Sequence, residues 1–154
     1  MSTDLVIHGA GQTVTGSCFE LQTRSGRLLV DCGLFQGSRT LEARNIGPLP
    51  FDPRAIDAVL LTHAHIDHSG LLPKLAASGF QGPIFTTGPT ADLLEWMLPD
   101  AARIQELDAE RRNRRADRAD TEAHRPLYTV ADARAALGRL MPTAPGRIIR
   151  PLPG

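Results

Sequence analysis

Several residue types and patterns are scarce in this chain of 154 residues, and each scarcity excludes a class of protein. Its two cysteines, Cys18 and Cys32, are too few for a disulfide framework. The 17 basic and 17 acidic residues cancel, so no net field favours nucleic acid or an anionic membrane. No apolar run approaches the roughly 20 residues that span a bilayer, and the start lacks the segments of a signal peptide. These absences predict a cytoplasmic protein with no membrane partner.

Lysine and aromatic residues are also scarce, but neither shortage prevents folding. Lys74 is the only lysine, and the excess of arginine indicates the codon usage of a GC-rich genome rather than a binding surface. Aromatic residues make up 5% of the chain, whereas the apolar fraction of 42% is ordinary for a globular protein. The length suits about one domain.

Short apolar segments separated by turn-forming residues come first, and longer helical patterns follow. Apolar residues that alternate or run together over a few positions predict strands, and those that recur every three or four positions predict helices. The predicted strands are 4–8, 17–23, 27–31, 57–62 and 83–87, the predicted helices are 67–78, 90–118 and 130–140, and 32–55 is a long loop rich in glycine and proline. This order favours an α/β layered fold, with a mixed sheet and helices on one face.

The long predicted helix loses its apolar face over residues 108–125. Six arginines alternate there with five acidic residues. Balanced charge of this kind is typical of a solvated helix end or a mobile segment. The arginines therefore do not by themselves predict a nucleic-acid surface.

Three of the five histidines lie within one short motif, THAHIDHSG at residues 62–70. Imidazole nitrogen and carboxylate oxygen are common zinc ligands. His63 and His65 are two positions apart, so an extended backbone directs both side chains the same way. Asp67 and His68 fall in the next turn, where they can face a second ion. A single histidine at a strand end is more often an ordinary polar residue, but this cluster predicts two neighbouring metals that can share a hydroxide.

The sequence around this motif resembles a known family. HAHIDH matches the HxHxDH signature of the metallo-β-lactamase superfamily, which glyoxalase II, lactonases and tRNA 3′-processing enzymes also carry. Three longer segments are more selective: GAGQTVTGS at 9–17, LLVDCGLFQG at 28–37 and IDAVLLTHAHIDHSGLLPKL at 56–75. Together they resemble the β-CASP branch of RNA-processing nucleases, which includes the nuclease subunit of the pre-mRNA cleavage and polyadenylation complex.

This resemblance implies a fold, a cofactor and a set of ligands. The fold is the amino-terminal half of the αββα metallo-β-lactamase sandwich, and the cofactor is a pair of Zn²⁺ ions. His63 and His65 would bind the first ion, and Asp67 and His68 the second. Asp67 would also position the attacking water, which makes it the expected catalytic residue.

Other residues are expected to support the site or to lie away from it. The resemblance implies that Asp31, at the end of a predicted strand, holds a metal ligand in orientation. The alternative for Asp31 is a residue that ends a strand and caps a turn. Ser17 and Thr15 are expected to shape the floor of the site without a chemical role. His8 is expected to be structural, and His124 to be exposed.

The family pattern needs more ligands than this sequence supplies. A third histidine for the first zinc, a bridging aspartate and a further histidine are expected from later motifs. The only histidine after His68 is His124, and Asp132 has no histidine near it. We therefore interpret 1–154 as a partial metallo-β-lactamase domain with no β-CASP domain: 1–107 is the best-matched core, 108–126 the charged helix end, and 127–154 a short helix and truncated linker.

Three functions remain open on this evidence, and activity of the chain alone is left undecided. The first is a zinc-dependent hydrolase of RNA phosphodiester bonds when intact. The second is a non-catalytic fragment or split-site partner, completed by a second chain or by homo-oligomerisation. The third is a small-molecule thioesterase or lactonase of the same superfamily, which the VDCGLFQG segment disfavours.

Overall fold

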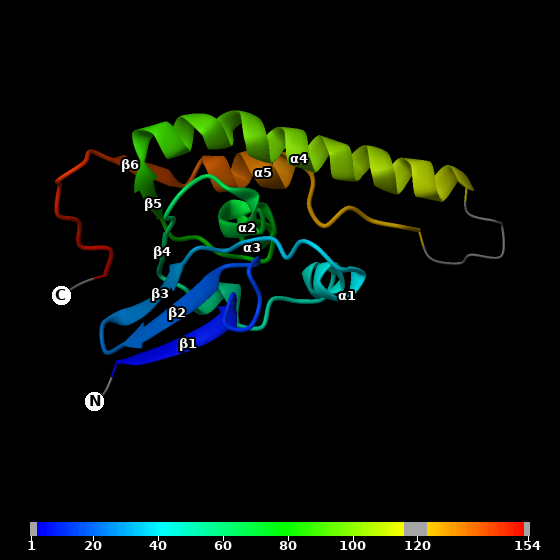
Figure 1. Cartoon of the computed structure of the whole chain (residues 1–154). Helices are drawn as coiled ribbons and strands as arrows, with labels where there is room; N and C mark the ends of the chain where they lie inside the picture. The colour runs from blue at the N-terminus through cyan, green and yellow to red at the C-terminus, as the bar shows by residue number, and fades with distance from the viewer. Residues whose placement is uncertain (1–2, 116–122, 153–154) are drawn as a thin grey trace.

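A computed structural model describes residues 3–115 and 123–152 of the chain. Its six strands form one sheet in the order β1-β2-β3-β4-β5-β6 (Figure 1). The strands are β1 (Asp4–Gly9), β2 (Cys18–Thr23), β3 (Gly26–Val30), β4 (Ala58–Leu60), β5 (Ile84–Thr87) and β6 (Leu140–Thr143). The first three strands are antiparallel to one another, and β3 to β6 are parallel. The predicted mixed sheet is confirmed.

The turn between β2 and β3 fixes the start of the parallel half of the sheet. Gly26 has φ +143°, a backbone conformation that favours glycine. A Cβ at Gly26 would lie 2.4 Å from the Asp57 carboxylate, which accepts a hydrogen bond from the Arg27 backbone amide. The hairpin is thereby attached to the residue that precedes β4.

The helices are α1 (Arg39–Glu42), α2 (Ile66–Ser69), α3 (Leu72–Ala77), α4 (Gly88–Arg115) and α5 (Val130–Leu137), with two short 3₁₀ helices, η1 (Ala43–Asn45) and η2 (Pro53–Ala55). The helix predicted over 67–78 is two short helices, because Pro73 occupies the first turn of α3 and cannot continue α2. The long helix begins at Gly88 and passes through Pro99. The predicted end of that helix at 118 lies outside the described residues.

The carboxy-terminal part contains a strand that the sequence did not reveal. Residues 130–140 were predicted to be one helix followed by a linker, but α5 ends at Leu137 and Leu140–Thr143 pairs with β5. Pro142 does not prevent this pairing, since β6 is an edge strand and proline is tolerated there. The pattern LMPT has too few residues to show its partner, so only the tertiary structure defines this strand.

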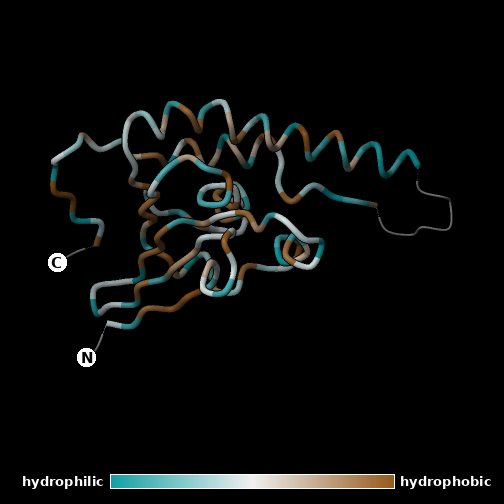
Figure 2. The backbone as a smooth tube through the Cα atoms, viewed as in Figure 1, coloured by the Kyte–Doolittle hydropathy of each residue, from teal (hydrophilic) through white to brown (hydrophobic). Residues whose placement is uncertain are grey.

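The core lies between one face of the sheet and the helices. Fully buried residues on the central strands, Leu29, Val59 and Ile84, join one apolar cluster with side chains of α3, α4 and α5. The helices of this layer lie on one side of the sheet (Figure 1), and apolar segments concentrate between them and the strands (Figure 2). The prediction of helices on one face is confirmed.

The opposite face of the sheet is much less covered. Among the described residues, Leu5, Ile7 and Met141 are 59%, 55% and 52% exposed. The described residues therefore form one sheet layer and one helix layer. None of the described helices is long and apolar enough to cross a membrane.

Candidate metal centre

The site lies where two neighbouring parallel strands end. Asp31 follows β3, and Thr62 and His63 follow β4. The Asp31 amide donates to the Leu60 carbonyl at 3.0 Å, which continues the β3–β4 pairing to the edge of the sheet. The carboxyl ends of parallel strands are the usual place for sites in α/β folds.

The four predicted metal ligands come together at this edge. The ring centroids of His63 and His65 are 4.7 Å apart, and those of His63 and His68 are 4.1 Å apart. Nε2 of His68 lies 3.7 Å from a carboxylate oxygen of Asp67. The His68 and Asp67 side chains are 26% and 23% exposed, so the cluster is accessible to solvent. The helical turn α2 carries Asp67 and His68 back toward the two histidines at the strand end.

Asp31 orients one of these histidines, His68, through a hydrogen bond to its ring. Its carboxylate is buried and accepts a 2.7 Å hydrogen bond from Nδ1 of His68, which leaves Nε2 free to face the cluster. The same carboxylate accepts hydrogen bonds from the Ser17 hydroxyl and from the amide and hydroxyl of Thr62. Asp31 has φ +63°, a conformation that aspartate tolerates better than most residues. The contact with Thr62 also fits the strand-capping alternative, so the hydrogen bonds of Asp31 are compatible with both expected roles.

Thr62 is a member of the site that the sequence interpretation missed. Its hydroxyl donates to Asp31 at 2.9 Å and lies 2.9 Å from Nδ1 of His63. Because the hydroxyl has one proton, it can accept from Nδ1–H of His63, and this tautomer leaves Nε2 of His63 free. The only sequence signal was a hydroxyl residue directly before the first histidine of the motif.

Main-chain hydrogen bonds fasten the motif to two distant loops. Ser17 donates its amide to the Asp67 carbonyl, and Cys32 donates to the His68 carbonyl, both at 2.9 Å. Gly33 passes so close that a Cβ there would lie 1.7 Å from the Asp67 carbonyl oxygen. Ser17 therefore contacts the motif directly, which is compatible with its expected place at the floor of the site. Thr15 instead exchanges hydrogen bonds with the backbone of Gln36 and is held apart from the ligands.

The remaining histidines lie away from the cluster. Nε2 of His8 is 2.7 Å from the buried carboxylate of Glu20, which agrees with the expected structural role. His124 is exposed, as expected, and its backbone is bonded to the Asn113 side chain at the end of α4.

The donors fit zinc in kind but not in number. Two imidazoles with free Nε2 atoms, a third imidazole and a carboxylate are typical zinc donors. Within residues 3–115 and 123–152, however, no three histidine, cysteine, aspartate or glutamate side chains are placed to hold one ion. The cysteines do not fill this gap: the neighbouring Cys18 thiol and burial both raise the pKa of Cys32, which disfavours the thiolate that zinc requires.

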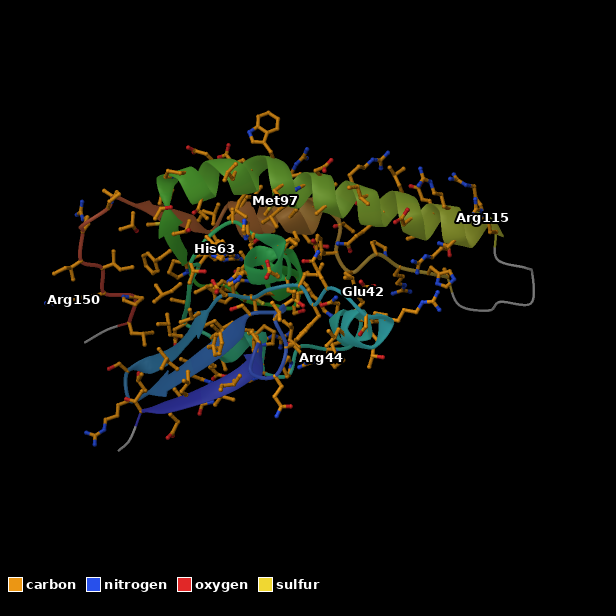
Figure 3. The ribbon with its side chains drawn as sticks, viewed as in Figure 1. Glu42, Arg44, His63, Met97, Arg115 and Arg150 are labelled. Carbon is orange, nitrogen blue, oxygen red and sulfur yellow. The ribbon has the colours of Figure 1, made fainter. Side chains whose placement is uncertain are left out.

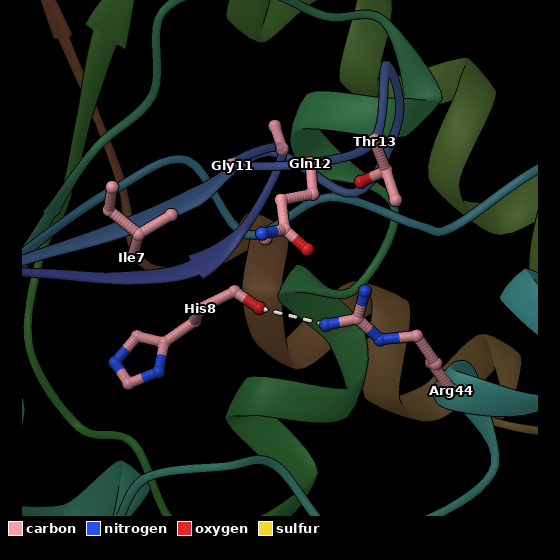
Figure 4. A pocket seen from close by; sticks show the side chains of 8 residues that line it. Ile7, His8, Gly11, Gln12, Thr13 and Arg44 are labelled. Carbon is pink, nitrogen blue, oxygen red and sulfur yellow. Dashed lines mark hydrogen bonds between the residues drawn. The ribbon is translucent and has the colours of Figure 1, made fainter.

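A pocket of about 350 Å³ lies at the other end of the loop that carries Ser17 (Figure 4). It is lined by residues of the β1 end and this loop and by Arg44, whose guanidinium donates to the His8 carbonyl at 3.1 Å. The same guanidinium lies 3.9 Å from the centroid of the Phe35 ring. The pocket therefore presents a positioned cation, although none of the four predicted metal ligands lines it.

A sequence profile described as the metallo-beta-lactamase superfamily matches residues 11–117, which include the whole histidine motif. The chain belongs to the metallo-β-lactamase superfamily. Among curated proteins, this superfamily member is 40% identical over 146 residues to ribonuclease TTHA0252 of Thermus thermophilus, covering 95% of the chain and 29% of that protein. It is 31% identical over 137 residues to cleavage and polyadenylation specificity factor 73 of Drosophila melanogaster, covering 86% of the chain and 17% of that protein.

These relatives confirm the resemblance to the β-CASP RNA nucleases. The chain also matches the transcription termination factor FttA of Methanosarcina mazei, with 43% identity over 91 residues, 56% of the chain and 14% of that protein. The chain thus spans less than a third of each of these curated relatives. Among solved structures, MEM-A1, a subclass B3 metallo-β-lactamase from a soil metagenome library, has a TM-score of 0.48 and 15% identity, covering 88% of this chain and 42% of that one.

Proposed function

We propose that this chain supplies part of the metal site of a zinc-dependent hydrolase that cleaves RNA phosphodiester bonds. The observation that supports this most strongly is the convergence of His63, His65, Asp67 and His68 at the end of β4. Nδ1 of His63 and of His68 are both engaged within the protein, so their Nε2 atoms are available as ligands.

The ligands divide into two pairs along the chain. His63 and His65, on the extended segment after β4, would hold one zinc ion, and Asp67 and His68, on α2, would hold the other. When bound, zinc supplies Lewis acidity, which stabilises negative charge on a phosphodiester and lowers the pKa of water. Asp31 keeps His68 in the tautomer that this role requires.

Asp67 is the residue that we assign to catalysis. Its carboxylate is partly exposed and lies beside His68, whereas its carbonyl accepts a hydrogen bond from the Ser17 amide. A carboxylate in this position can accept a hydrogen bond from a water molecule and direct the water oxygen toward a substrate. Because the backbone is held on both sides of Asp67, little reorganisation would accompany that step.

RNA is the substrate class that the relatives favour. One is named a ribonuclease and another a cleavage and polyadenylation factor, whereas none of the relatives reported above carries the name of a thioesterase or lactonase. The protein's two free cysteines are consistent with a reducing compartment, so we place it in the cytoplasm.

A non-catalytic role is the second candidate, because the described residues place no three metal-binding side chains around one point. In this case the four ligands would be half of a site, and the remaining ligands would come from outside the described residues. A second chain or a second copy could supply them. The two candidates differ in whether zinc binding is accompanied by hydrolysis.

Zinc titration by calorimetry tests the shared claim. We expect the chain to bind zinc. His63→Ala and His68→Ala should each weaken zinc binding at least tenfold, because each ion has two protein ligands and loses one of them. His124→Ala is the matched control, because only the backbone of this exposed histidine is bonded. Zinc affinity unchanged in both site variants would overturn the proposal.

Hydrolysis then separates the candidates. Zinc-loaded protein is incubated with end-labelled single-stranded RNA and, separately, with a thioester. RNA cleavage that is lost in Asp67→Ala supports the nuclease, whereas zinc binding without cleavage of either substrate supports the non-catalytic half-site. Cleavage of the thioester alone would contradict the RNA assignment.

A further inference from the structure

Helix α4 has one face packed on the protein and one apolar face turned to solvent. Its buried residues, which include Ala91, Leu94, Leu98, Ala102 and Ala109, form the packed stripe. On the outer side, Leu93, Trp96 and Ile104 are 62%, 80% and 53% exposed. In Figure 1, α4 lies along the outside of the molecule with α5 beneath it. The exposed side chains thus belong to the face that points away from the body.

These exposed residues, together with the partly buried Leu107, have the spacing of a helix–helix contact. Leu93, Trp96, Asp100, Ile104 and Leu107 follow one another at intervals of three or four, so they form a single stripe along the helix. Scattered exposed apolar residues need no explanation, but a row that includes a tryptophan is typical of an interaction surface.

Charge divides α4 into two halves of opposite sign. Its first half contains the exposed acids Asp92, Glu95 and Asp100 and has no basic residue from Gly88 to Ala102. The second half contains three acids, Glu106, Asp108 and Glu110, but it also contains Arg103 and ends in four exposed arginines, Arg111, Arg112, Arg114 and Arg115, so its net charge is positive. Figure 2 shows the hydrophilic carboxy-terminal end of this helix, and Figure 3 labels Arg115 there.

Few of the charged side chains of α4 form ion pairs within the chain. The ion pairs of α4 among the described residues are Arg103–Glu106 and Arg111–Asp108, both at 3.5 Å and solvent-accessible. Acids near the start and bases near the end also suit the helix dipole, but that effect is confined to the first and last turns. It explains neither Asp100 in the middle of the helix nor the exposed Trp96.

We propose that the outer face of α4 binds a second copy of this chain, with the two α4 helices antiparallel. An antiparallel pair places the acidic half of each helix against the basic half of the other, so the same surface complements itself about a two-fold axis. A parallel pair would instead bring acid against acid and arginine against arginine.

One alignment of the two antiparallel helices brings most residues of the stripe into contact. When the axis passes between Arg103 and Ile104, Trp96 lies opposite Arg111 of the second copy, where a guanidinium can stack on the indole. Asp92, on the edge of the stripe, then lies level with Arg114 of the second copy, and Asp100 lies within about one helical turn of Arg111. The stripe from Leu93 to Arg114 is roughly 32 Å long at 1.5 Å per residue, so the interface is at the small end of specific interfaces. Association is therefore expected to be weak and sensitive to salt.

Trp96 is the only tryptophan in the chain, so its fluorescence reports this face alone. Sedimentation velocity and emission spectra are recorded over a concentration series of the whole chain. Dimerisation should double the sedimenting mass and shift the Trp96 emission to shorter wavelength over the same concentrations, and added salt should reverse both. A monomer with unshifted emission at all concentrations would overturn the proposal.

Charge reversal tests the antiparallel arrangement. One variant combines Asp92→Lys with Asp100→Lys, and the other combines Arg111→Glu with Arg114→Glu. Each alone should weaken self-association at least tenfold, and an equimolar mixture should regain it as a heterodimer, which also shows that both variants are folded. Arg24→Glu with Glu42→Lys, exposed residues away from α4, is the matched control.

The open face of the sheet is the main alternative surface for self-association. If the chain associates but neither reversal weakens association, the contact lies elsewhere and the proposal is wrong. Zinc binding and hydrolysis play no part in these measurements, so the outcome is independent of the proposed function.

Discussion

Two buried carboxylates, Glu20 on β2 and Asp31 directly after β3, differ in a way that separates a structural cluster from a candidate functional one. Each lies 2.7 Å from a histidine nitrogen, His8 for Glu20 and His68 for Asp31. Glu20 also binds the Arg27 guanidinium at 2.6 Å and the Gln22 amide. Among the described residues, the only ion pair of Asp31 is with His68.

The difference lies in the source of positive charge. A buried carboxylate needs an opposite charge or several hydrogen bonds. Glu20 has a permanent cation of its own, and its histidine is 10% exposed, so that cluster is complete within the protein. Asp31 instead relies on three hydroxyl and amide donors and on a histidine that is 26% exposed and faces other ligands. This arrangement favours a cation bound beyond His68.

The largest effect on stability is expected for Glu20→Ala. Removing the carboxylate leaves Arg27 and His8 without their partner, and breaking a buried pair costs several kcal/mol. Because the Arg27 side chain is 34% exposed, we expect a loss of about 3 kcal/mol in the free energy of unfolding, at the low end of the usual range. Urea denaturation measures this loss. Zinc affinity should be unchanged; a parallel loss of zinc binding would remove the distinction between the clusters.

Asp31→Asn should have the opposite pattern. The amide retains most of the shape but cannot accept from His68 with the strength of a carboxylate, so the His68 ring loses its fixed orientation. We expect zinc affinity to fall 10–100-fold, with a loss of about 1–2 kcal/mol in stability. Calorimetry and urea denaturation of the same preparation give both values. A variant that loses stability but binds zinc normally would assign Asp31 to strand capping alone.

These two clusters also show how far the sequence could be interpreted. The histidine motif was identified because the spacing of its residues is a local signal, whereas the role of Asp31 was implied by the resemblance of LLVDCGLFQG to a family motif. Thr62 was missed because its role depends on the adjacency of β3 and β4, which only the sheet creates. Glu20 was missed because its partners come from β1 and β3. The strand β6 was missed for the same reason, since its pairing with β5 is not visible in four residues.

Thr62→Val should have an intermediate effect on the site. Valine keeps the volume but removes the hydroxyl that links Asp31 and Nδ1 of His63. We expect zinc affinity to fall several-fold, less than in Asp31→Asn, because Asp31 keeps its other donors. Thr62→Ser retains the hydroxyl and is the matched control. Equal zinc affinity in all three proteins would show that the hydroxyl does not orient His63.

The smallest expected effect is the contribution of Glu20 to the pH dependence of stability, but its direction can be predicted. Burial alone raises the pKa of Glu20, but hydrogen bonds from Arg27, His8 and Gln22 outweigh it, so the pKa lies below the usual 4.5. Its contribution to stability is therefore complete above pH 4.5 and is lost as the pH falls through the lower folded-state pKa. Thermal unfolding of Glu20→Gln should show a shallower decrease in this acidic range than the unmodified chain. Identical profiles would contradict the assignment.

X-ray absorption at the zinc edge of the zinc-loaded chain tests the central claim most directly. If the cluster at the end of β4 binds zinc, the spectrum should show nitrogen and oxygen ligands at about 2.0–2.1 Å, the multiple scattering of imidazole, and no sulfur. The imidazole contribution should decrease in His68→Ala and remain in His124→Ala. Sulfur at about 2.3 Å would assign the metal to Cys18 and Cys32, and a fully hydrated ion would show that the four residues do not bind it.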